Sequence, residues 1–493
     1  MSTSATKETA TSQTKAPGAD APPEPAGHRL RWWGLAVVLA AEVMDLLDTT
    51  IVGVASPSIR SDFGGSSTQI QWITAAYTLS FAVLMITGAR LGDVFGRRRM
   101  FLVGVTGFTA CSALCAGATG SGMLIGARTA QGAFAAMLVP QGLGIIRQMF
   151  PPKEMGAAFG MFGPVIGLSS VAGPVLGGFL TDADLFGSGW RMIFLINVPL
   201  GIAALATALK VVPDGRAPKA SRLDLPGVVL VSAAALLLVY PLVQGRDLGW
   251  PLWTYLSMAA SLPVLGLFGL HLRRVRNRGG SPLVEPGLFR NRAFTSALVV
   301  GIVFFAAMSG LMLVLTLHLQ LALGYTPLHA GATMIAWSVG TVVGAVLAGS
   351  VLGPKFGRRT LHGGLAVVVA GVLALTWSIH AAGHGATTWQ LAPALVMCGF
   401  GMGLLMAPFF DIALAGVRDD EVGSASGTLN AVQQLGGSIG VAVLGTVYFG
   451  VTDTSGDSAA QRTLLITAAA FAATFAVAFL LPRTARPHDE AQA

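Results

Sequence analysis

The chain has 493 residues, of which 53% are hydrophobic and only 11% are charged, and its mean hydropathy is +0.68. Soluble domains carry about 25% charged residues, so this composition excludes a water-soluble globular protein and predicts one whose solvent is largely lipid. The formal net charge of +8 would suit a nucleic-acid binder, but the basic residues are spread between apolar segments. Cys111, Cys115 and Cys398 lie inside apolar runs, which favours small packing residues over a disulfide or metal site.

Apolar segments long enough to cross a bilayer recur along the chain. A hydrocarbon core of about 30 Å needs roughly twenty apolar residues per helix. Residues 1–32 precede these segments and are predicted to form a disordered cytoplasmic tail. Fourteen spans are predicted, near residues 33–56, 70–91, 99–118, 122–147, 155–180, 190–211, 224–243, 252–272, 293–323, 328–352, 361–382, 389–416, 422–451 and 462–481.

The distribution of Lys and Arg predicts the topology. With the N-terminus in the cytoplasm, 25 of the 31 basic residues fall in cytoplasmic loops and tails. The external side holds four, Arg60, Arg191, Arg246 and Arg462, and two lie within spans, Arg90 and Arg128. Cytoplasmic loops of membrane proteins carry such an excess of positive charge. The net charge is therefore explained by topology, and an even number of spans places both termini in the cytoplasm.

An internal repeat predicts two related halves. GARLGDVFGRRRMF begins at Gly88 and GSVLGPKFGRRTL at Gly349. Each copy ends the second span of a six-span set if spans 7 and 8 are an insertion, an arrangement typical of alternating-access transporters. The predicted fold is all-α and membrane-embedded. Its parts are a six-helix bundle at 33–212, two extra spans with cytoplasmic loops at 213–292, a second six-helix bundle at 293–481 and a cytoplasmic tail at 482–493.

The sequence lacks the signatures of an enzyme. The loops between spans are too short for a soluble catalytic domain, and none of the six lysines follows a glycine, so a P-loop for ATP is absent. Neither HExxH nor GxSG occurs. We expect no enzymatic activity, no cofactor, no metal, no ATP and no nucleic-acid partner.

Five motifs give the chain a family resemblance. They are LLDTTIVGVASPSI (Leu46–Ile59), RTAQG (Arg128–Gly132), GMFGPVIGLSSVAGPVLGG (Gly160–Gly178), WRMIFLINVPLG (Trp190–Gly201) and NAVQQLGGSIG (Asn430–Gly440). Together they resemble the major facilitator superfamily, specifically its fourteen-span drug:proton antiporter family, over nearly the whole chain after residue 30. The resemblance implies the major facilitator fold, with two six-helix bundles plus two extra helices, and export driven by protons.

The motifs also depart from the family pattern in places. In the first motif Gly53 replaces the usual Asn and Ser56 the usual Leu. In the loop after span 2, Ala89 and Val94 stand where the superfamily has a glycine and an arginine. The importers of the superfamily share that loop, so the evidence for an antiporter comes from the motifs of spans 5 and 6.

Ionisable residues inside the spans are the strongest functional candidates, because charge within a bilayer is costly. Glu42, Asp45 and Asp48 follow one another at intervals of three residues in span 1, so neighbours share a helix face. Burial and mutual repulsion favour protonation of at least one of them. Arg128 in span 4 lies at a similar depth to Asp48, and we expect the two to pair in a proton-coupling site. The alternatives are carboxylates buried for packing and a static ion pair.

The loop after span 2 is a candidate conformational latch. The family resemblance implies that its charges bridge the bundles and stabilise the outward-facing state. The simpler reading is a positively charged helix end at the cytoplasmic surface. In the second copy Pro354 stands where the first has its acid. The residues concerned are Gly92, Asp93, Gly96, Arg97 and Arg98.

Span 5 is nearly without side chains along one surface. Small residues allow close helix approach, and proline inside a span bends it. We expect either ordinary close packing or a flexible seal against the other bundle that limits proton leak. The residues of this antiporter helix are Gly163, Pro164, Gly173, Pro174, Gly177 and Gly178.

A further set of polar residues could line a substrate path, although each also has a structural explanation. Asn197 more plausibly shapes span 6, His318 suits a membrane interface, and Asp411 lies near the cytoplasmic end of its span. The set is Gln131, Tyr77, Asn197, His318 and Asp411.

The leading hypothesis from sequence is a proton-coupled exporter of lipophilic or cationic drugs across the plasma membrane. Its partners would be a small-molecule substrate, protons and the lipid bilayer. The alternatives are an exporter dedicated to one endogenous metabolite or antibiotic, an uptake symporter and, more distantly, a membrane sensor without transport. The sequence leaves open the substrate, the oligomeric state (a monomer is compatible), the choice of proton or sodium, and the role of spans 7 and 8.

Overall fold

The computed structural model describes residues 29–482 apart from positions 65, 152–153, 155–157, 159–160, 185–186, 215–223, 246, 416, 418–420 and 451–455. Every regular element in the described ranges is helical. The two predicted tails therefore lie almost entirely outside the described residues.

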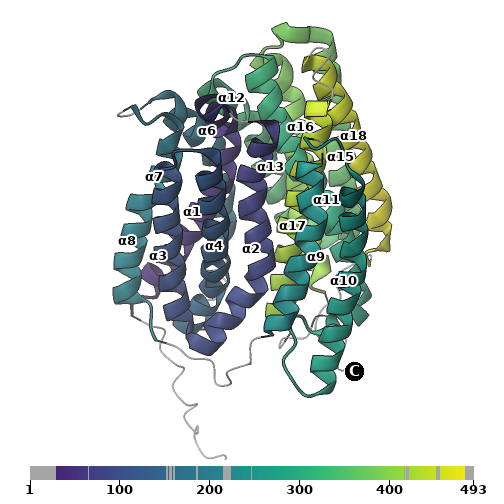
Figure 1. Ribbon diagram of the computed structural model, residues 1–493. Helices are drawn as coiled ribbons and strands as arrows, with labels where there is room; N and C mark the ends of the chain where they lie inside the picture. The colour runs from purple at the N-terminus through teal and green to yellow at the C-terminus, as the bar shows by residue number, and fades with distance from the viewer. Residues whose placement is uncertain are drawn as a thin grey trace, which may run out of the picture.

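The helices form an upright array in which the first half of the chain packs beside the second (Figure 1). In the first half α1 contacts α2, α4, α6 and α8, while α4 packs against α2 and α3. These helices are α1 (Arg31–Phe63), α2 (Ser67–Phe95), α3 (Arg97–Ala116), α4 (Ser121–Met149), α6 (Phe162–Asp182), α7 (Met192–Leu195) and α8 (Asn197–Val211). We call them the first bundle.

The second half repeats this pattern. In it α16 packs against α13 and α15, and α11 packs against α17 and α18. Its helices are α11 (Arg292–Leu317), α12 (Pro327–Thr333), α13 (Ile335–Leu347), α14 (Gly353–Phe356), α15 (Arg358–Ala382), α16 (Thr388–Ala413), α17 (Val422–Gly450) and α18 (Gly456–Val477). We call them the second bundle.

Twelve helical segments in the described part of the chain are long and apolar enough to span a membrane. The sequence predicts fourteen, and the two that are not among the twelve correspond to α1 and α6. The helix α1 is long and apolar, but its three carboxylates give it more charge than an ordinary span carries, and many side chains of α6 lie outside the described residues. Fourteen spans therefore stays a prediction.

The sequence repeat has a structural counterpart at the end of each second helix. Gly96, with φ of 97°, separates α2 from α3, and Gly357, with φ of 48°, separates α14 from α15. Only glycine adopts such angles without strain. An arginine just after each turn then binds backbone carbonyls near the end of its bundle's last helix. Arg98 donates to Leu209 O over 2.6 Å, and Arg358 donates to Phe479 O over 2.9 Å.

The two extra helices, α9 (Leu225–Gln244) and α10 (Leu252–Asn277), form a hairpin that α9 attaches to both bundles. Figure 1 shows them in teal, in front of the second bundle. Trp72 of α2 donates to Gln244, and Thr446 of α17 donates to Leu242 O. Most of α10 is exposed, as expected for a face in lipid, where backbone groups are satisfied within the helix.

The bundles meet through α2 and α17, and again where α6 ends beside α12. At the second contact a Cβ on Gly178 would lie 2.4 Å from Pro327 O, and one on Gly331 would lie 2.2 Å from Pro174 O. Asp182 accepts a hydrogen bond from the backbone N–H of Leu328 over 3.0 Å. Backbone therefore packs on backbone here, which only glycine permits.

Candidate functional site

The carboxylate of Asp48 lies at the centre of a polar network inside the first bundle. Arg128 of α4 forms an ion pair with it, and the side chains of Asp48 and Arg128 are 0% and 1% exposed. Gln131 Nε2 donates to Asp48 Oδ1 over 2.9 Å, and Asn197 Nδ2 of α8 donates to the same oxygen over 3.2 Å. Ser112 of α3 accepts from both amides. Four helices thus contribute groups to one buried charge pair.

Arg128 makes further contacts within the bundle. Its Nε donates to Ile73 O over 3.2 Å, and its Nη1 also donates to Gln131 Oε1 over 2.8 Å. The guanidinium lies over the ring of Tyr77, 4.2 Å from the ring centroid, a distance typical of a cation–π contact. These contacts fix the orientation of the guanidinium, and the ion pair with Asp48 balances its charge.

Asp45 has a different environment from Asp48, one turn away on the same helix. It accepts a hydrogen bond from the Tyr77 hydroxyl of α2. No hydrogen bond from an arginine, lysine or amide side chain reaches its carboxylate in the described residues. Tyr77 therefore touches both parts of the site, with its hydroxyl on Asp45 and its ring on Arg128.

Glu42 is the third carboxylate of α1 and the most accessible. It is partly exposed, and its Oε1 lies 3.9 Å from the position of a Cβ on Gly142 of α4. No hydrogen bond or ion pair to it occurs within the part of the chain that the structure describes. Along α1, therefore, Asp48 is paired with an arginine, Asp45 has one hydrogen bond from a tyrosine, and Glu42 has no direct partner among the described residues.

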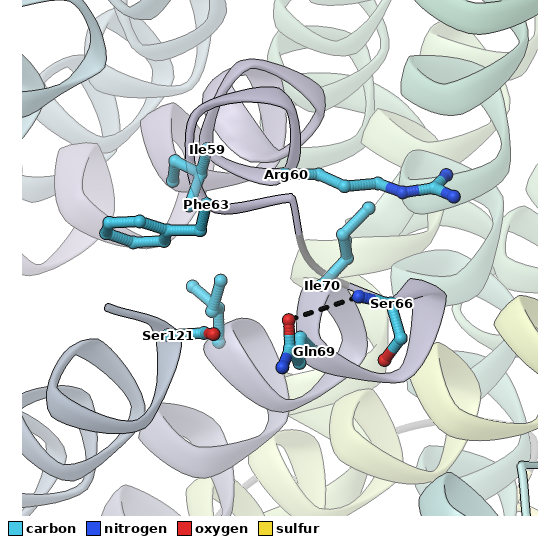
Figure 2. Close-up of a pocket in the computed structure, with 8 residues that line it drawn as sticks. Ile59, Arg60, Phe63, Ser66, Gln69, Ile70 and Ser121 are labelled. Atoms are coloured by element: carbon cyan, nitrogen blue, oxygen red, sulfur yellow. Dashed lines mark hydrogen bonds between the residues drawn. The ribbon is translucent and has the colours of Figure 1, made fainter. Parts of the chain in front are cut away.

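A small pocket at the loop between α1 and α2 approaches this site without opening into it. It is lined by Ile59, Arg60, Phe63, Ser66, Gln69, Ile70, Ile73 and Ser121 (Figure 2). Ile59, Ile70 and Ile73 are buried, and the carbonyl of Ile73 is the one that Arg128 binds. These side chains separate the ion pair from the solvent at this end.

Apart from the pair that Arg98 forms with Asp214, which follows α8, the described contacts of the predicted latch residues lie within the first bundle. Gly92 packs against the Gln141 amide, and the Arg97 guanidinium lies over Gly144 of α4. Arg98 pairs with Asp214 over 3.0 Å in addition to its bond to Leu209. The side chain of Asp93 lies outside the described residues. The arginine that contacts the segment leading to the second bundle is Arg90, which donates to Pro282 O.

The glycines of α6 fall into two groups by what they contact. A Cβ on Gly173 would lie 2.0 Å from Thr50 Oγ1, and one on Gly177 would lie 3.0 Å from Ile51, both in α1. Gly178 alone of these three faces the second bundle, at Pro327. Pro174 bends the helix beside them. The surroundings of Gly163 and Pro164 lie outside the described residues.

The five candidates for a substrate path do not form one path. Gln131, Tyr77 and Asn197 all belong to the buried network around the carboxylates. His318 is buried at the end of α11, where a π-helical turn from His318 to Ala322 begins. Asp411 is exposed near the end of α16. Gln320, beside His318, instead joins the bundles by donating to Val54 O of α1 over 2.7 Å.

No prediction from the sequence concerned Ser112, and none placed Asn197 and Gln131 beside Asp48. A lone serine in an apolar span has no signal of its own. The hydrogen-bond requirement of Asp48 could have indicated these residues. A buried aspartate needs several hydrogen bonds, and an arginine supplies only some of them. Amide and hydroxyl side chains at similar depth in α3, α4 and α8 were the remaining donors available.

The arrangement can exchange protons and attract cations. The described residues contain no cluster of His, Cys, Asp or Glu suited to a metal. Cys111, Cys115 and Cys398 are free and buried. A bundle interior with one paired and two less satisfied carboxylates is typical of ion-coupled membrane proteins.

Comparisons with known proteins agree with the architecture. A family profile described as Major Facilitator Superfamily matches residues 38–441. The chain is 51% identical to a probable actinorhodin transporter of Streptomyces coelicolor, over 91% of this chain and 78% of that protein. It is 38% identical to a puromycin resistance protein of Streptomyces alboniger, over 86% and 82% of the two chains.

Solved structures support the fold alone. The crystal structure of the POT family transporter PepTSo superposes with a TM-score of 0.68 at 14% identity, covering 91% of this chain and 97% of that one. The family expected from the motifs of spans 1, 4, 5, 6 and 13 is confirmed. This chain is a multi-pass membrane protein that belongs to the Major Facilitator Superfamily.

Proposed function

We propose that the protein exports lipophilic or cationic antibiotic-like molecules across the plasma membrane in exchange for protons. The observation that carries this proposal is the buried set of ionisable side chains of α1, α2 and α4, held inside one bundle of a transporter fold. The names of the relatives, which refer to actinorhodin transport and puromycin resistance, support the substrate class.

The site residues take the following roles in this proposal. Asp48 and Arg128 form the charged centre of the coupling site, with Asp45 and Glu42 as further carboxylates along α1. Gln131 and Asn197 hold Asp48 in place, and Tyr77 contacts both Asp45 and Arg128. Both termini lie in the cytoplasm, as the excess of basic residues on that side indicates.

Reconstitution tests the proposal directly. The purified protein is placed in liposomes that contain a pH-sensitive dye, and actinorhodin, puromycin and ethidium are added in turn under an imposed pH gradient. An antiporter moves protons against the direction of the added compound, and the signal is absent from protein-free liposomes. Movement of protons and compound in the same direction would show a symporter, and no movement with any compound would contradict the proposal.

The same panel separates a second candidate, an exporter dedicated to one compound. The relative at 51% identity is named for a single compound, actinorhodin, which favours this alternative. A response to actinorhodin without a response to puromycin or ethidium would identify a dedicated exporter. Responses to chemically unrelated compounds would identify a multidrug exporter.

A further inference from the structure

The two buried aspartates of α1 differ in how their charge is compensated. Asp48 accepts hydrogen bonds from Arg128, Gln131 and Asn197, and the arginine balances its charge. Asp45 accepts one described side-chain bond, from the neutral hydroxyl of Tyr77. Asp48 is 1% exposed, and Asp45 is 7% exposed. Both carboxylates are therefore buried, but only the charge of Asp48 is balanced by an ion pair.

This difference decides which group can change its protonation at low cost. Protonating Asp48 would leave the Arg128 guanidinium buried without a counter-charge, which is strongly unfavourable. Protonating Asp45 removes a negative charge that no partner balances, and the Tyr77 hydroxyl can still hydrogen-bond to the neutral acid. Asp45 is therefore the aspartate that can take and give up a proton at the lower cost.

Tyr77 is placed to link the two aspartates. Its side chain is 0% exposed, and it supplies the hydroxyl to Asp45 and the ring face to Arg128. The backbone of α4 approaches closely at this point, because a Cβ on Gly132 would lie 2.4 Å from Tyr77 O. The glycine that ends the RTAQG motif thus allows α4 to pack closely against α2 at Tyr77.

We infer that Asp45 carries the transported proton, that Tyr77 is its positioning residue, and that Asp48 and Arg128 form a fixed charge pair beside it. This inference rests on the proposed function as a proton-coupled transporter. The charged or titratable groups that face Asp45 are Glu42 and Asp48 on its own helix, Tyr77 on α2 and Arg128 on α4.

The proton step balances without a co-reactant. A proton from hydronium on the side open to water adds to a carboxylate oxygen of Asp45, which leaves one water molecule. After the bundles rearrange, water on the other side removes the same proton. Tyr77 keeps its own proton throughout, and Glu42, one turn nearer the N-terminus and partly exposed, lies between Asp45 and that end of α1.

Infrared difference spectroscopy of the purified full-length protein tests the inference without any substrate. Acidification should produce the carbonyl band of a protonated carboxylic acid. We expect this band to disappear in Asp45→Asn and to persist in Asp48→Asn. We expect it to persist with an altered pH profile in Tyr77→Phe. A band that is lost in Asp48→Asn or Glu42→Gln and persists in Asp45→Asn would overturn the assignment.

Transport in liposomes gives a second readout, with puromycin and ethidium as probes. Asp45→Asn should lose pH-driven transport completely while it still exchanges probe across the membrane. Tyr77→Phe should lower the driven rate about tenfold, the effect expected when a charged group loses one hydrogen bond. The matched control is Tyr448→Phe, which removes a hydroxyl from a buried tyrosine of α17 and should transport as the wild type does.

The two readouts separate failure of the inference from failure of the proposed function. Driven transport in Asp45→Asn at the wild-type rate would overturn the inference while leaving export intact. If the wild type moves neither probe, the infrared result still assigns the titrating carboxyl. Loss of driven transport in Tyr448→Phe as large as that in Tyr77→Phe would show a general effect of hydroxyl removal and would also overturn the role of Tyr77.

Discussion

The two bundles share a fold but differ in what they bury. The first encloses Asp45, Asp48 and Arg128 together with amide side chains. Among the described residues of the second, the buried polar side chains are hydroxyls and His318. Most of these hydroxyls bond to a carbonyl one turn back in their own helix, as Thr463 does to Ala459 and Ser438 does to Gln434.

Aromatic rings take the place of charge in the second bundle. Phe305 packs against Phe409 with 5.9 Å between centroids, and Phe409 packs against Phe410 at 5.3 Å. Edge-on contacts of this kind stabilise a core without requiring hydrogen-bond partners. The comparison shows that duplication of the fold does not require duplication of its chemistry. In our proposal one bundle couples to protons and the other presents an apolar surface.

The largest expected effect comes from breaking the buried pair. Arg128→Ala leaves the Asp48 carboxylate buried without its counter-charge, which costs about 3–5 kcal/mol, and it should abolish driven transport. Thermal unfolding in detergent measures the loss. The double variant Arg128→Ala, Asp48→Asn should recover much of the stability, because the stranded charge is gone.

The matched control is an exposed ion pair. Arg276 and Glu285 lie 2.9 Å apart, and the Arg276 side chain is 60% exposed. Arg276→Ala should cost less than about 1 kcal/mol. If Arg276→Ala and Arg128→Ala destabilise the protein equally, burial of the Asp48–Arg128 pair does not increase its effect on stability, and the proposed difference between the bundle interior and the exposed surface is wrong.

Sequence alone could place Asp48 and Arg128 together because helix rise fixes depth. Counting residues from the predicted span ends at 1.5 Å each put both groups at similar levels, and the structure has them in contact. The same arithmetic selects Asp48 by depth, but it cannot show whether that side chain faces the arginine. That depends on the rotation of α1 about its axis, and a helix that is apolar on nearly all sides gives no periodic signal for rotation.

The remaining features required packing information. The Asp45–Tyr77 bond joins residues 32 apart whose helices had to be oriented first. The roles of Asn197 and Ser112 depend on α8 and α3 approaching the same point. The sequence predicts the glycines of α6 as one surface, whereas the structure separates Gly173, which faces α1, from Gly178, which faces the other bundle.

The contact between the bundles at Gly178 can be tested by adding a side chain there. A side chain at Gly178 would meet Pro327 O and the Cα of Leu328 at 2.4 and 2.6 Å. Gly178→Val should cost about 1–3 kcal/mol at this contact and force α6 and α12 apart. Spin labels at Asp184 and Leu321 should report a longer distance between bundles, and transport should fall.

Two glycine variants serve as references for that measurement. Gly126 of α4 has nothing within 4 Å of a built Cβ, so Gly126→Val should leave both distance and transport near the wild type. Gly173→Val clashes with Thr50 inside the first bundle and should abolish transport while the protein still inserts into the membrane. An unchanged label distance in Gly178→Val would mean that this contact does not hold the bundles together.

The smallest effect concerns a charge outside both bundles. Asp224 caps α9 and accepts from the Gly227 and Leu283 amides over 3.0 Å each, and it lies 2.6 Å from His271 Nε2 of α10. Burial opposes its ionisation. The hydrogen bonds from His271, Leu283 and Gly227 outweigh burial and lower the pKa of Asp224 below its ordinary value of 3.8.

A lowered pKa in the folded state means that ionised Asp224 stabilises the fold above its unfolded value, about pH 3.9, and that this contribution is lost as pH falls through the folded value. Asp224→Asn should therefore cost about 1 kcal/mol at pH 7, with a difference from the wild type that shrinks below pH 4 or so. Thermal unfolding at the two pH values measures it. A cost that is the same at both would assign the effect to lost packing. The expected pH dependence would show that charge at this position anchors the α9–α10 hairpin.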